Sequence, residues 1–235
     1  MKNMIIASTS TLHESGYLEY LLDDLKMLFK DASEILFIPY ARPSGVTHDD
    51  YTQKVTEAFL KINKQIKGIH TFENPIEAIK NAEAIFVGGG NTFVLLYQLY
   101  KNNLITILKE TVKKGIPYLG TSAGSNICGL TIKTTNDMPI IYPPSFNAIG
   151  LVPFNINPHY LDPDLNSKHM GETRETRIQE FHHFNTQPVI GLREGSWLHV
   201  KDHSIILKGN LTARIFEQNK TPYEVDSGTE LNSLK

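Results

Sequence analysis

The sequence predicts an α/β fold with a mostly parallel sheet covered by helices on both faces, extended by antiparallel strands near the C-terminus. Two observations support this prediction. In the first half of the 235-residue chain, short apolar segments alternate with amphipathic segments of helical length, which is typical of a parallel sheet. From Pro188 onward, short apolar segments alternate with turn residues, which favours an antiparallel extension of that sheet.

The first half contains its expected elements in regular order. We expect strands at residues 4–7, 35–39, 66–71, 84–87 and 116–119, and helices at residues 17–29, 51–62, 76–81, 92–100 and 104–113. The expected strands are short apolar runs, and the first helix is indicated by Leu21, Leu25 and Leu28, which recur at helical spacing. Ligands bind at the carboxyl ends of the strands in such sheets, where two glycine-rich segments occur.

The second half has a different composition. Residues 131–157 are rich in Pro, Asn and Asp, which predicts loops and short strands. The expected elements that follow are a helix at residues 172–184 and strands at residues 189–192, 197–200, 205–207 and 213–216. Because no linker or repeat interrupts the sequence, we expect a single domain over residues 1–235, with a polar, loosely held tail at about 226–235.

Composition limits the expected partners and cofactors. Lys and Arg number 23 against 25 Asp and Glu, so no basic excess favours nucleic acid or an anionic membrane. The lone cysteine, Cys128, excludes a disulfide within the chain, and the N-terminal apolar run is too short for a signal peptide, so we expect a cytoplasmic location. No H-E-x-x-H motif or cysteine pair indicates a metal, and we expect no cofactor.

The segment Gly120-Thr121-Ser122-Ala123-Gly124 is the strongest indication of chemistry. It follows an apolar run and matches the G-x-S-x-G pattern of a sharp strand-to-helix corner that exposes one hydroxyl. The residue after the serine opens a helix, so its amide points toward whatever the serine attacks. The pattern predicts a nucleophile with half of an oxyanion hole, although an ordinary Gly/Ser turn has the same sequence.

A serine nucleophile needs a base and a third group that orients the base. Among nine histidines, His159 stands out because it follows a short apolar segment and the stiff Pro158; the alternative is a surface-loop histidine. His169, by contrast, falls in a polar loop. Two acids compete to orient the base, Glu194 and Asp137, and each also fits a turn carboxylate that bonds its own backbone.

A second glycine-rich segment, Gly88-Gly89-Gly90-Asn91, follows the expected strand at 84–87. It predicts either an anion cradle at a helix N-terminus or a second oxyanion donor, because glycine lets the backbone approach a tetrahedral intermediate. It matches neither G-x-G-x-x-G nor G-x-x-x-x-G-K-[ST], so it gives little support to nucleotide binding. An ordinary strand-to-helix turn fits the segment equally well.

Six segments occur in the order that is typical of one known family. They are Val87-Gly88-Gly89-Gly90-Asn91-Thr92-Phe93, Ser122-Ala123-Gly124, Thr134-Thr135-Asn136-Asp137-Met138-Pro139-Ile140, Ile156-Asn157-Pro158-His159, Gly171-Glu172-Thr173-Arg174-Glu175 with Arg177-Ile178, and Ile190-Gly191-Leu192 with Glu194-Gly195 and Trp197. The chain therefore resembles the peptidase E family, the cytoplasmic α-aspartyl dipeptidases, which are serine peptidases. The six motifs together are far more specific than any one of them.

The resemblance implies a three-layer α/β/α fold related to the class I glutamine amidotransferases. It implies hydrolysis of dipeptides with an N-terminal aspartate, so the expected partner is a small dipeptide. On the matching positions, Ser122 is implied as the nucleophile and His159 as the general base. Gly90 and Ala123 are implied as the oxyanion amides.

The resemblance leaves the orienting acid open. Glu194 matches the acid of a Ser-His-Glu triad, whereas Asp137 matches an acid also assigned to the active centre. An aspartyl side chain taken out of water needs a cation, and Arg174 and Arg177 share a helix face at i,i+3 spacing. We predict that Arg174 clamps that side chain and that Arg177 also binds substrate, the alternative being a solvated, salt-bridged helix. Asp137 is an alternative anion for the substrate's α-ammonium.

Two positions depart from the family pattern. Thr121 stands where the family often has tryptophan, so a wider pocket is expected beside the nucleophile. Ser125 replaces a commoner alanine and is expected to be a bystander. Two other functions fit parts of the sequence: a cyanophycinase-like hydrolase of β-aspartyl linkages, and a non-catalytic binder of phosphate or acidic metabolites at residues 88–91.

Overall fold

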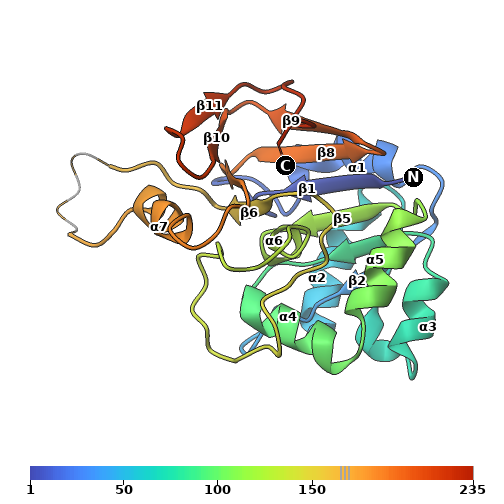
Figure 1. Cartoon of the computed structure of the whole chain (residues 1–235). Coiled ribbons are helices and arrows are strands. Elements are labelled where there is room, and N and C mark those ends of the chain that lie inside the picture. Colours follow the sequence, from blue (N-terminus) through green and yellow to red (C-terminus); the bar gives the residue numbers. More distant parts are fainter. Residues whose placement is uncertain (165, 167, 169, 235) are drawn as a thin grey trace.

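The computed structural model of the chain describes every residue except positions 165, 167, 169 and 235. His169, predicted to lie in a polar loop, is therefore outside the described residues. The structure contains a seven-stranded and a four-stranded sheet (Figure 1). The larger sheet has the order β3 (Gln65–Gly68), β2 (Glu34–Ile38), β4 (Ile85–Val87), β5 (Tyr118–Thr121), β1 (Asn3–Ala7), β8 (Ser196–Lys201) and β9 (Ser204–Gly209). The smaller sheet has the order β11 (Tyr223–Val225), β10 (Ala213–Phe216), β7 (Val189–Leu192) and β6 (Asn155–Pro158).

The first five strands of the larger sheet are parallel. β2 pairs with β3 and β4, and β5 pairs with β4 and β1, all in parallel. Their carboxyl ends therefore lie at one edge of the sheet, where the glycine segment follows β4 and Ser122 follows the neighbouring β5. The predicted α/β fold with a mostly parallel central sheet is confirmed.

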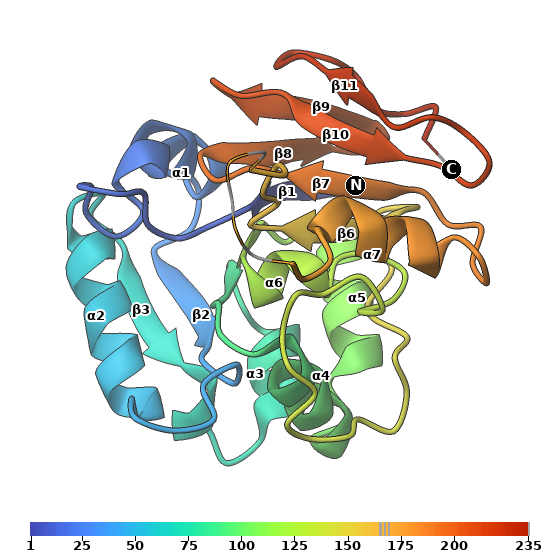
Figure 2. The same ribbon diagram turned by 90° about the vertical axis from the view of Figure 1, so that its left-hand side faces the viewer.

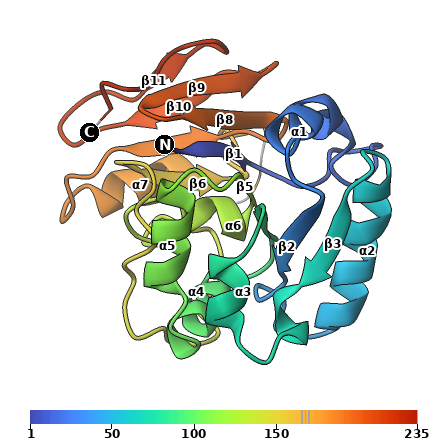
Figure 3. The ribbon, with the colours of Figure 1, turned by 90° about the vertical axis from the view of Figure 1, so that its right-hand side faces the viewer.

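Helices cover both faces of the parallel strands (Figure 3). One face carries α1 (Leu22–Leu28) and α2 (His48–Leu60), and the other carries α3 (Pro75–Lys80), α4 (Thr92–Lys101), α5 (Ile105–Lys113) and the short α6 (Ala123–Asn126). Alternate residues of β1 point to opposite faces: Met4 and Ile6 join the core of α4 and α5, whereas Ile5 and Ala7 join the core of α1 and α2. None of the helices in the described part of the chain is long and apolar enough to cross a membrane.

Three predicted elements are shorter in the structure by two or more residues, and one of them is the helix expected at residues 172–184, which spans Arg174–Phe181. The helix expected at residues 17–29 begins late because Leu18 has φ 58°, a left-handed conformation, and is followed by a 3-10 turn at Glu19–Leu21. The strand expected at residues 66–71 ends with β3, and Ile69–Thr71 forms another 3-10 turn. Apolar periodicity marks both segments, but it does not show where the backbone turns.

The predicted antiparallel extension is correct for β8 and β9 and wrong for β7 and β10. β8 pairs antiparallel with the whole of β1, from Asn3 opposite Lys201 to Ala7 opposite Trp197, and β9 pairs antiparallel with β8 at the edge of the larger sheet. β7 pairs instead with β6 in parallel and with β10 antiparallel in the smaller sheet. The turn that carries the chain from β7 to β8 contains Gly195, whose φ of 88° favours glycine.

The prediction of a loosely held tail is wrong for the residues described there. The Leu231 amide donates a 2.8 Å hydrogen bond to the Ile205 carbonyl, and Glu230 forms an isolated β-bridge with Ile206. Leu231 and Leu234 are buried in the main core. Two leucines in an otherwise polar segment are enough to hold it against β9.

Candidate active site

Ser122 lies at a tight corner between β5 and α6. Its backbone has φ 54° and ψ −112°, a conformation that side chains rarely adopt, and its amide donates a 3.2 Å hydrogen bond to the Ala7 carbonyl. The corner requires glycine on either side. A Cβ at Gly124 would collide with the Val87 carbonyl, and a Cβ at Gly120 would collide with the Gly124 carbonyl. The local sequence thus produces the strained serine corner.

The structure brings Ser122, His159 and Glu194 into one hydrogen-bonded line. His159 Nε2 lies 2.8 Å from Ser122 Oγ, and His159 Nδ1 lies 2.6 Å from Glu194 Oε1. The His159 and Glu194 side chains are 34% and 52% exposed, so the line runs outward toward solvent. In this arrangement the imidazole can take a proton from the serine at one nitrogen while the carboxylate holds the proton on the other.

Strand register explains why His159 and Glu194 meet although 35 residues separate them. β6 and β7 are adjacent parallel strands with Pro158 opposite Leu192, so the residues that follow both strands emerge at the same edge. His159 follows β6 directly with φ 54°, and Glu194 comes two residues after β7. The second sheet therefore supplies both members of this pair.

Ser8, which has no catalytic pattern around it in the sequence, fixes the backbone of His159. It follows β1 and is fully buried. Its Oγ accepts a 2.8 Å hydrogen bond from the His159 amide and donates a 2.7 Å hydrogen bond to the Leu192 carbonyl. Ser8 thereby joins the larger sheet to the ends of β6 and β7. Its position at the carboxyl end of an expected parallel strand is the one signal that the sequence offers for it.

The predicted oxyanion donors belong to the two segments that border the nucleophile. Ala123 is the first residue of α6, and Gly90 has φ 145° and packs so closely on Ala41 that a Cβ would collide with the Ala41 carbonyl. A Cβ at Gly89 would lie 3.5 Å from Ser122 Oγ, so the glycine segment adjoins the reacting hydroxyl. Among the hydrogen bonds of the described residues, none uses the Gly90 or Ala123 amide, which leaves both donors for an oxyanion.

Asp137, the other candidate acid, lies at the N-terminus of α4. Its Oδ2 accepts a 2.7 Å hydrogen bond from the Thr92 amide and a 3.1 Å hydrogen bond from the Thr135 hydroxyl. A carboxylate at this position satisfies a free helical amide and meets the positive end of the helix. Of the two candidate acids, Glu194 is the one that hydrogen-bonds His159.

Arg174 begins α7 (Arg174–Phe181), which lies beside β6 and packs on the smaller sheet (Figure 2). Its Nη1 is buried and has no hydrogen-bond partner among the described residues. Burial lowers the pKa of the Arg174 guanidinium and the positive Arg177 lowers it further, while Glu194 and Asp137 act in the opposite direction. A half-buried, unpaired cation within electrostatic reach of both acids is suited to binding an anion.

A hollow of about 330 Å³ extends from Arg174 over the segment that follows β6. It is bounded by Asn136, by residues 161–164 and by residues 171–174 and 177. Arg177 is mostly exposed and lies 3.8 Å from Glu172, so part of its charge is already matched. Arg174 is therefore the stronger of the two cations offered to a ligand in the hollow.

The sequence is similar to those of known proteins. The sequence profile of Peptidase family S51 matches residues 4–208. The chain belongs to peptidase family S51. It is 45% identical to "Peptidase E" of Streptomyces coelicolor, over 99% of this chain and 94% of that protein. It is 47% identical to a "Probable alpha-aspartyl dipeptidase" of Drosophila melanogaster, over 97% of this chain and 92% of that protein. The resemblance to the peptidase E family is thus confirmed.

Two crystal structures of low sequence identity share the fold. A putative peptidase E protein from Listeria monocytogenes matches with a TM-score of 0.67 and 21% identity, over 89% of this chain and 98% of that chain. A peptidase from an acI-B1 Actinobacterium matches with a TM-score of 0.69 and 17% identity, over 98% and 96%. At these identities the two matches show a shared fold.

Arg193, in the turn after β7, is the centre of a charged network. Its guanidinium donates to both carboxylate oxygens of Asp162, at 2.7 and 2.8 Å, and to Glu224 at 2.9 Å. Burial alone would raise the pKa of Glu224, but hydrogen bonds from Arg193, Thr212 and Arg214 lower it to about 2. The network ties the segment that lines the hollow to β11, a long-range contact that the sequence does not reveal.

Both departures from the family pattern are buried beneath the nucleophile. Thr121 is fully buried. The wider pocket expected beside Ser122 stays a prediction. Ser125 is also fully buried, and its hydroxyl lies 2.6 Å from the Ala7 carbonyl oxygen and 2.8 Å from that of Gly120. Ser125 therefore supports the corner through the backbone, a structural role, and its catalytic part stays as predicted, that of a bystander.

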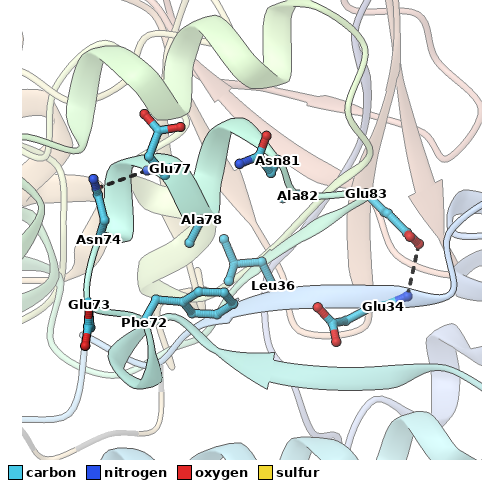
Figure 4. Close-up of a pocket in the computed structure, with 10 residues that line it drawn as sticks. All are labelled: Glu34, Leu36, Phe72, Glu73, Asn74, Glu77, Ala78, Asn81, Ala82 and Glu83. Atoms are coloured by element: carbon cyan, nitrogen blue, oxygen red, sulfur yellow. Dashed lines mark hydrogen bonds between the residues drawn. The ribbon is translucent and has the colours of Figure 1, made fainter.

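A second hollow, of about 370 Å³, lies beside α3, toward the edge at which β2 and β4 begin (Figure 4). Glu34 and Glu83 line one end of it, and Glu83 accepts a 3.2 Å hydrogen bond from the Glu34 amide. Leu36, Phe72 and Ala78 also line it. It includes none of the predicted site residues. The candidate active site lies at the opposite end of the strands, where the parallel strands have their carboxyl ends.

Proposed function

We propose that this chain is a serine-type dipeptidase that hydrolyses dipeptides with an N-terminal aspartate. The observation that carries the proposal is the line of Ser122, His159 and Glu194, because it provides a nucleophile, a base and an orienting acid at hydrogen-bond distances. Membership of peptidase family S51 supports peptide-bond hydrolysis. The name of the Drosophila relative, a probable alpha-aspartyl dipeptidase, supports the substrate class.

In the proposed reaction, His159 Nε2 accepts the proton of Ser122 Oγ as this oxygen attacks the carbonyl carbon of the aspartyl residue. Glu194 holds the proton on Nδ1 and stabilises the imidazolium that forms. The amides of Gly90 and Ala123 donate hydrogen bonds to the tetrahedral oxyanion. The imidazolium then protonates the leaving nitrogen, the C–N bond breaks, and an ester joins the aspartyl group to the serine.

Water completes the proposed reaction by the same proton path in reverse. His159 takes a proton from a water molecule, which attacks the ester carbonyl, and returns the proton to Ser122 Oγ as aspartate leaves. The outward course of the line toward solvent fits this step, because His159 and Glu194 are both partly exposed.

Charges of opposite sign beside the line suit an N-terminal aspartate. We assign Arg174 to the side-chain carboxylate, because its buried Nη1 has no partner among the described residues, and Arg177 to the outer wall of the same hollow. Asp137 is assigned to the α-ammonium, with one carboxylate oxygen kept on the Thr92 amide. Asp137 raises the pKa of the Arg174 guanidinium, so the two opposite charges lie within electrostatic reach of one another.

The test is the release of aspartate from Asp-Leu, compared with Glu-Leu, Asn-Leu and β-linked Asp-Leu, by the unaltered chain and by Ser122→Ala. We expect Asp-Leu to be the preferred substrate. We expect Ser122→Ala to lower kcat by roughly 10⁴-fold or more, because the remaining groups cannot form the ester.

Each alternative has its own result. Equal cleavage of the three α-linked peptides would refute the specificity, and preferred cleavage of the β-linked peptide would indicate a cyanophycinase-like hydrolase instead. Full activity in Ser122→Ala would refute the mechanism. A chain that hydrolyses none of these peptides and whose Ser122 is not labelled by a fluorophosphonate would be a non-catalytic binder.

A further inference from the structure

Arg42 is a cation without a carboxylate partner near the carboxyl edge of the parallel sheet. The chain has five arginines, and three of them, Arg177, Arg193 and Arg214, form ion pairs. Within the described part of the chain, Arg42 and Arg174 form none, and each has a buried guanidinium nitrogen without a hydrogen-bond partner. Arg174 is the proposed clamp for the aspartyl side chain, so Arg42 is the cation that remains unexplained.

The ring of Tyr51 lies between Arg42 and the glycine segment beside Ser122. It follows β2, and its guanidinium carbon lies 4.8 Å from the centroid of the Tyr51 ring. The Tyr51 hydroxyl accepts a 3.0 Å hydrogen bond from the Gly89 amide, and a Cβ at Gly89 would lie 3.5 Å from Ser122 Oγ. Arg42 also lines an open hollow over the loop of residues 42–48. Contacts through Tyr51 and Gly89 therefore link the cation to the segment beside Ser122, and the cation borders solvent.

Arg42 and Arg174 belong to segments that lie on opposite sides of α6. α6, which begins directly after Ser122, lies between the β2–α2 region and α7 (Figures 2 and 3). Arg42 belongs to the first of these regions and Arg174 to the second. If the aspartyl side chain points to Arg174, the leaving residue extends toward Arg42. In a dipeptide, the free carboxylate lies one residue beyond the scissile bond, about 3.5 Å of extended chain.

We propose that Arg42 binds the C-terminal carboxylate of the leaving residue and thereby selects dipeptides. This inference rests on the proposed function, because it places the scissile bond at Ser122 and the aspartyl side chain at Arg174. A guanidinium matches the two oxygens of a carboxylate, and the face of the Tyr51 ring holds it in position. A longer peptide, or a dipeptide with an amidated C-terminus, brings a neutral amide to the same place and leaves the cation unpaired.

The test compares Asp-Leu with Asp-Leu amide, using the unaltered chain, Arg42→Gln and the control Lys54→Gln. Lys54 is a neighbouring cation whose Nζ lies 5.1 Å from the Tyr17 ring, so its removal changes the charge of the same region. For the unaltered chain we expect kcat/KM to be roughly 10- to 100-fold higher with the free acid, the range of a charge-assisted hydrogen bond. Arg42→Gln should bring that ratio to within roughly threefold of unity, and Lys54→Gln should leave it as it is.

The ratio of kcat/KM for Asp-Leu to kcat/KM for its amide does not depend on how much of a variant is folded, because an unfolded fraction lowers the rates on both substrates equally. Equal rates of the unaltered chain on the acid and the amide would overturn the assignment of Arg42 and leave the dipeptidase proposal standing. The same conclusion would follow if Arg42→Gln kept the ratio, or if Lys54→Gln changed it as much. Failure of the unaltered chain to cleave Asp-Leu would instead refute the proposed function.

Discussion

The two sheets contribute to the active site in different ways. Ser122 and the glycine segment follow β5 and β4, neighbouring strands of the parallel sheet, and short glycine-containing sequences set their geometry. His159 and Glu194 follow β6 and β7 of the smaller sheet, are partly exposed, and meet through the register of two strands that are far apart in sequence. The nucleophile is thus encoded locally, whereas the base and its acid depend on long-range pairing.

The largest effect on catalysis is expected from replacing Glu194, the acid that follows β7 of the smaller sheet. Glu194→Gln keeps the shape of the side chain but removes the charge that stabilises the imidazolium and fixes its tautomer. We expect kcat for Asp-Leu to fall by roughly 10³- to 10⁴-fold with little change in KM, the range found when the acid of a serine triad is neutralised. Steady-state kinetics at neutral pH measure both constants.

Asp137→Asn is the matched control, because it makes the same chemical change in the acid held by α4. Asparagine retains an oxygen for the Thr92 amide, so helix capping is preserved. We expect kcat to fall by less than roughly 10-fold and KM to rise, as the loss of an ammonium-binding charge requires. A fall in kcat as large as that of Glu194→Gln would contradict the assignment of the two acids.

A smaller loss of activity is expected from replacing Tyr51, which contacts the glycine segment beside Ser122. Tyr51→Phe keeps the ring beneath Arg42 but removes the acceptor of the Gly89 amide, which then stays buried and unpaired. The neighbouring Gly90 amide loses its fixed position, and because one oxyanion donor is worth roughly 10²- to 10³-fold, we expect a partial loss of roughly 10-fold in kcat.

Tyr100→Phe is the control for Tyr51→Phe, because it removes a hydroxyl that donates to the Asn147 carbonyl on an exposed part of α4. We expect its kinetics to match those of the unaltered chain. The preference of Tyr51→Phe for Asp-Leu over its amide should also persist, since the ring that holds Arg42 remains. A rise in KM without a change in kcat would show that Tyr51 acts on substrate binding and not on the oxyanion.

The parallel side could be predicted because its signals are local. The apolar run and the glycines around Ser122, and the glycine segment after β4, specify strand, corner and helix within a few residues. What local patterns omit is the set of contacts that arrive from elsewhere. Ser8 supports the His159 amide and Tyr51 supports the Gly89 amide, and each is far from its partner in sequence.

The smaller sheet was harder to predict because its first strand, β6, lacks the apolar pattern that is typical of a buried strand. β6 has the sequence Asn-Ile-Asn-Pro, and both asparagines are buried, bonded to Thr131 and to the Thr134 carbonyl. Hydrophobic periodicity cannot detect a strand whose buried residues are polar. Glu194 could not be separated from Asp137 for a related reason, since the pairing of β6 with β7 decides which acid reaches the base.

Acid should weaken the charged network of the smaller sheet, and this is the smallest effect that we predict. Glu224 has a pKa of about 2 instead of the ordinary 4.5, so its ionised form stabilises the fold above the ordinary pKa and this contribution is lost as the pH falls from 4.5 toward 2. Its side chain is 37% exposed, so the free energy of unfolding should fall by about 1 kcal/mol or less in Glu224→Gln at neutral pH. Thermal unfolding of the unaltered chain and of Glu224→Gln should show a difference in Tm that narrows over that pH interval.

Glu77→Gln is the control, because it removes an exposed ion pair with Lys80 on α3. It should give a smaller difference in Tm, because that carboxylate has one cationic partner on an open helix surface. A Glu224→Gln gap that stayed constant from pH 6 to pH 2 would show that the network holds the sheet by packing and not by charge.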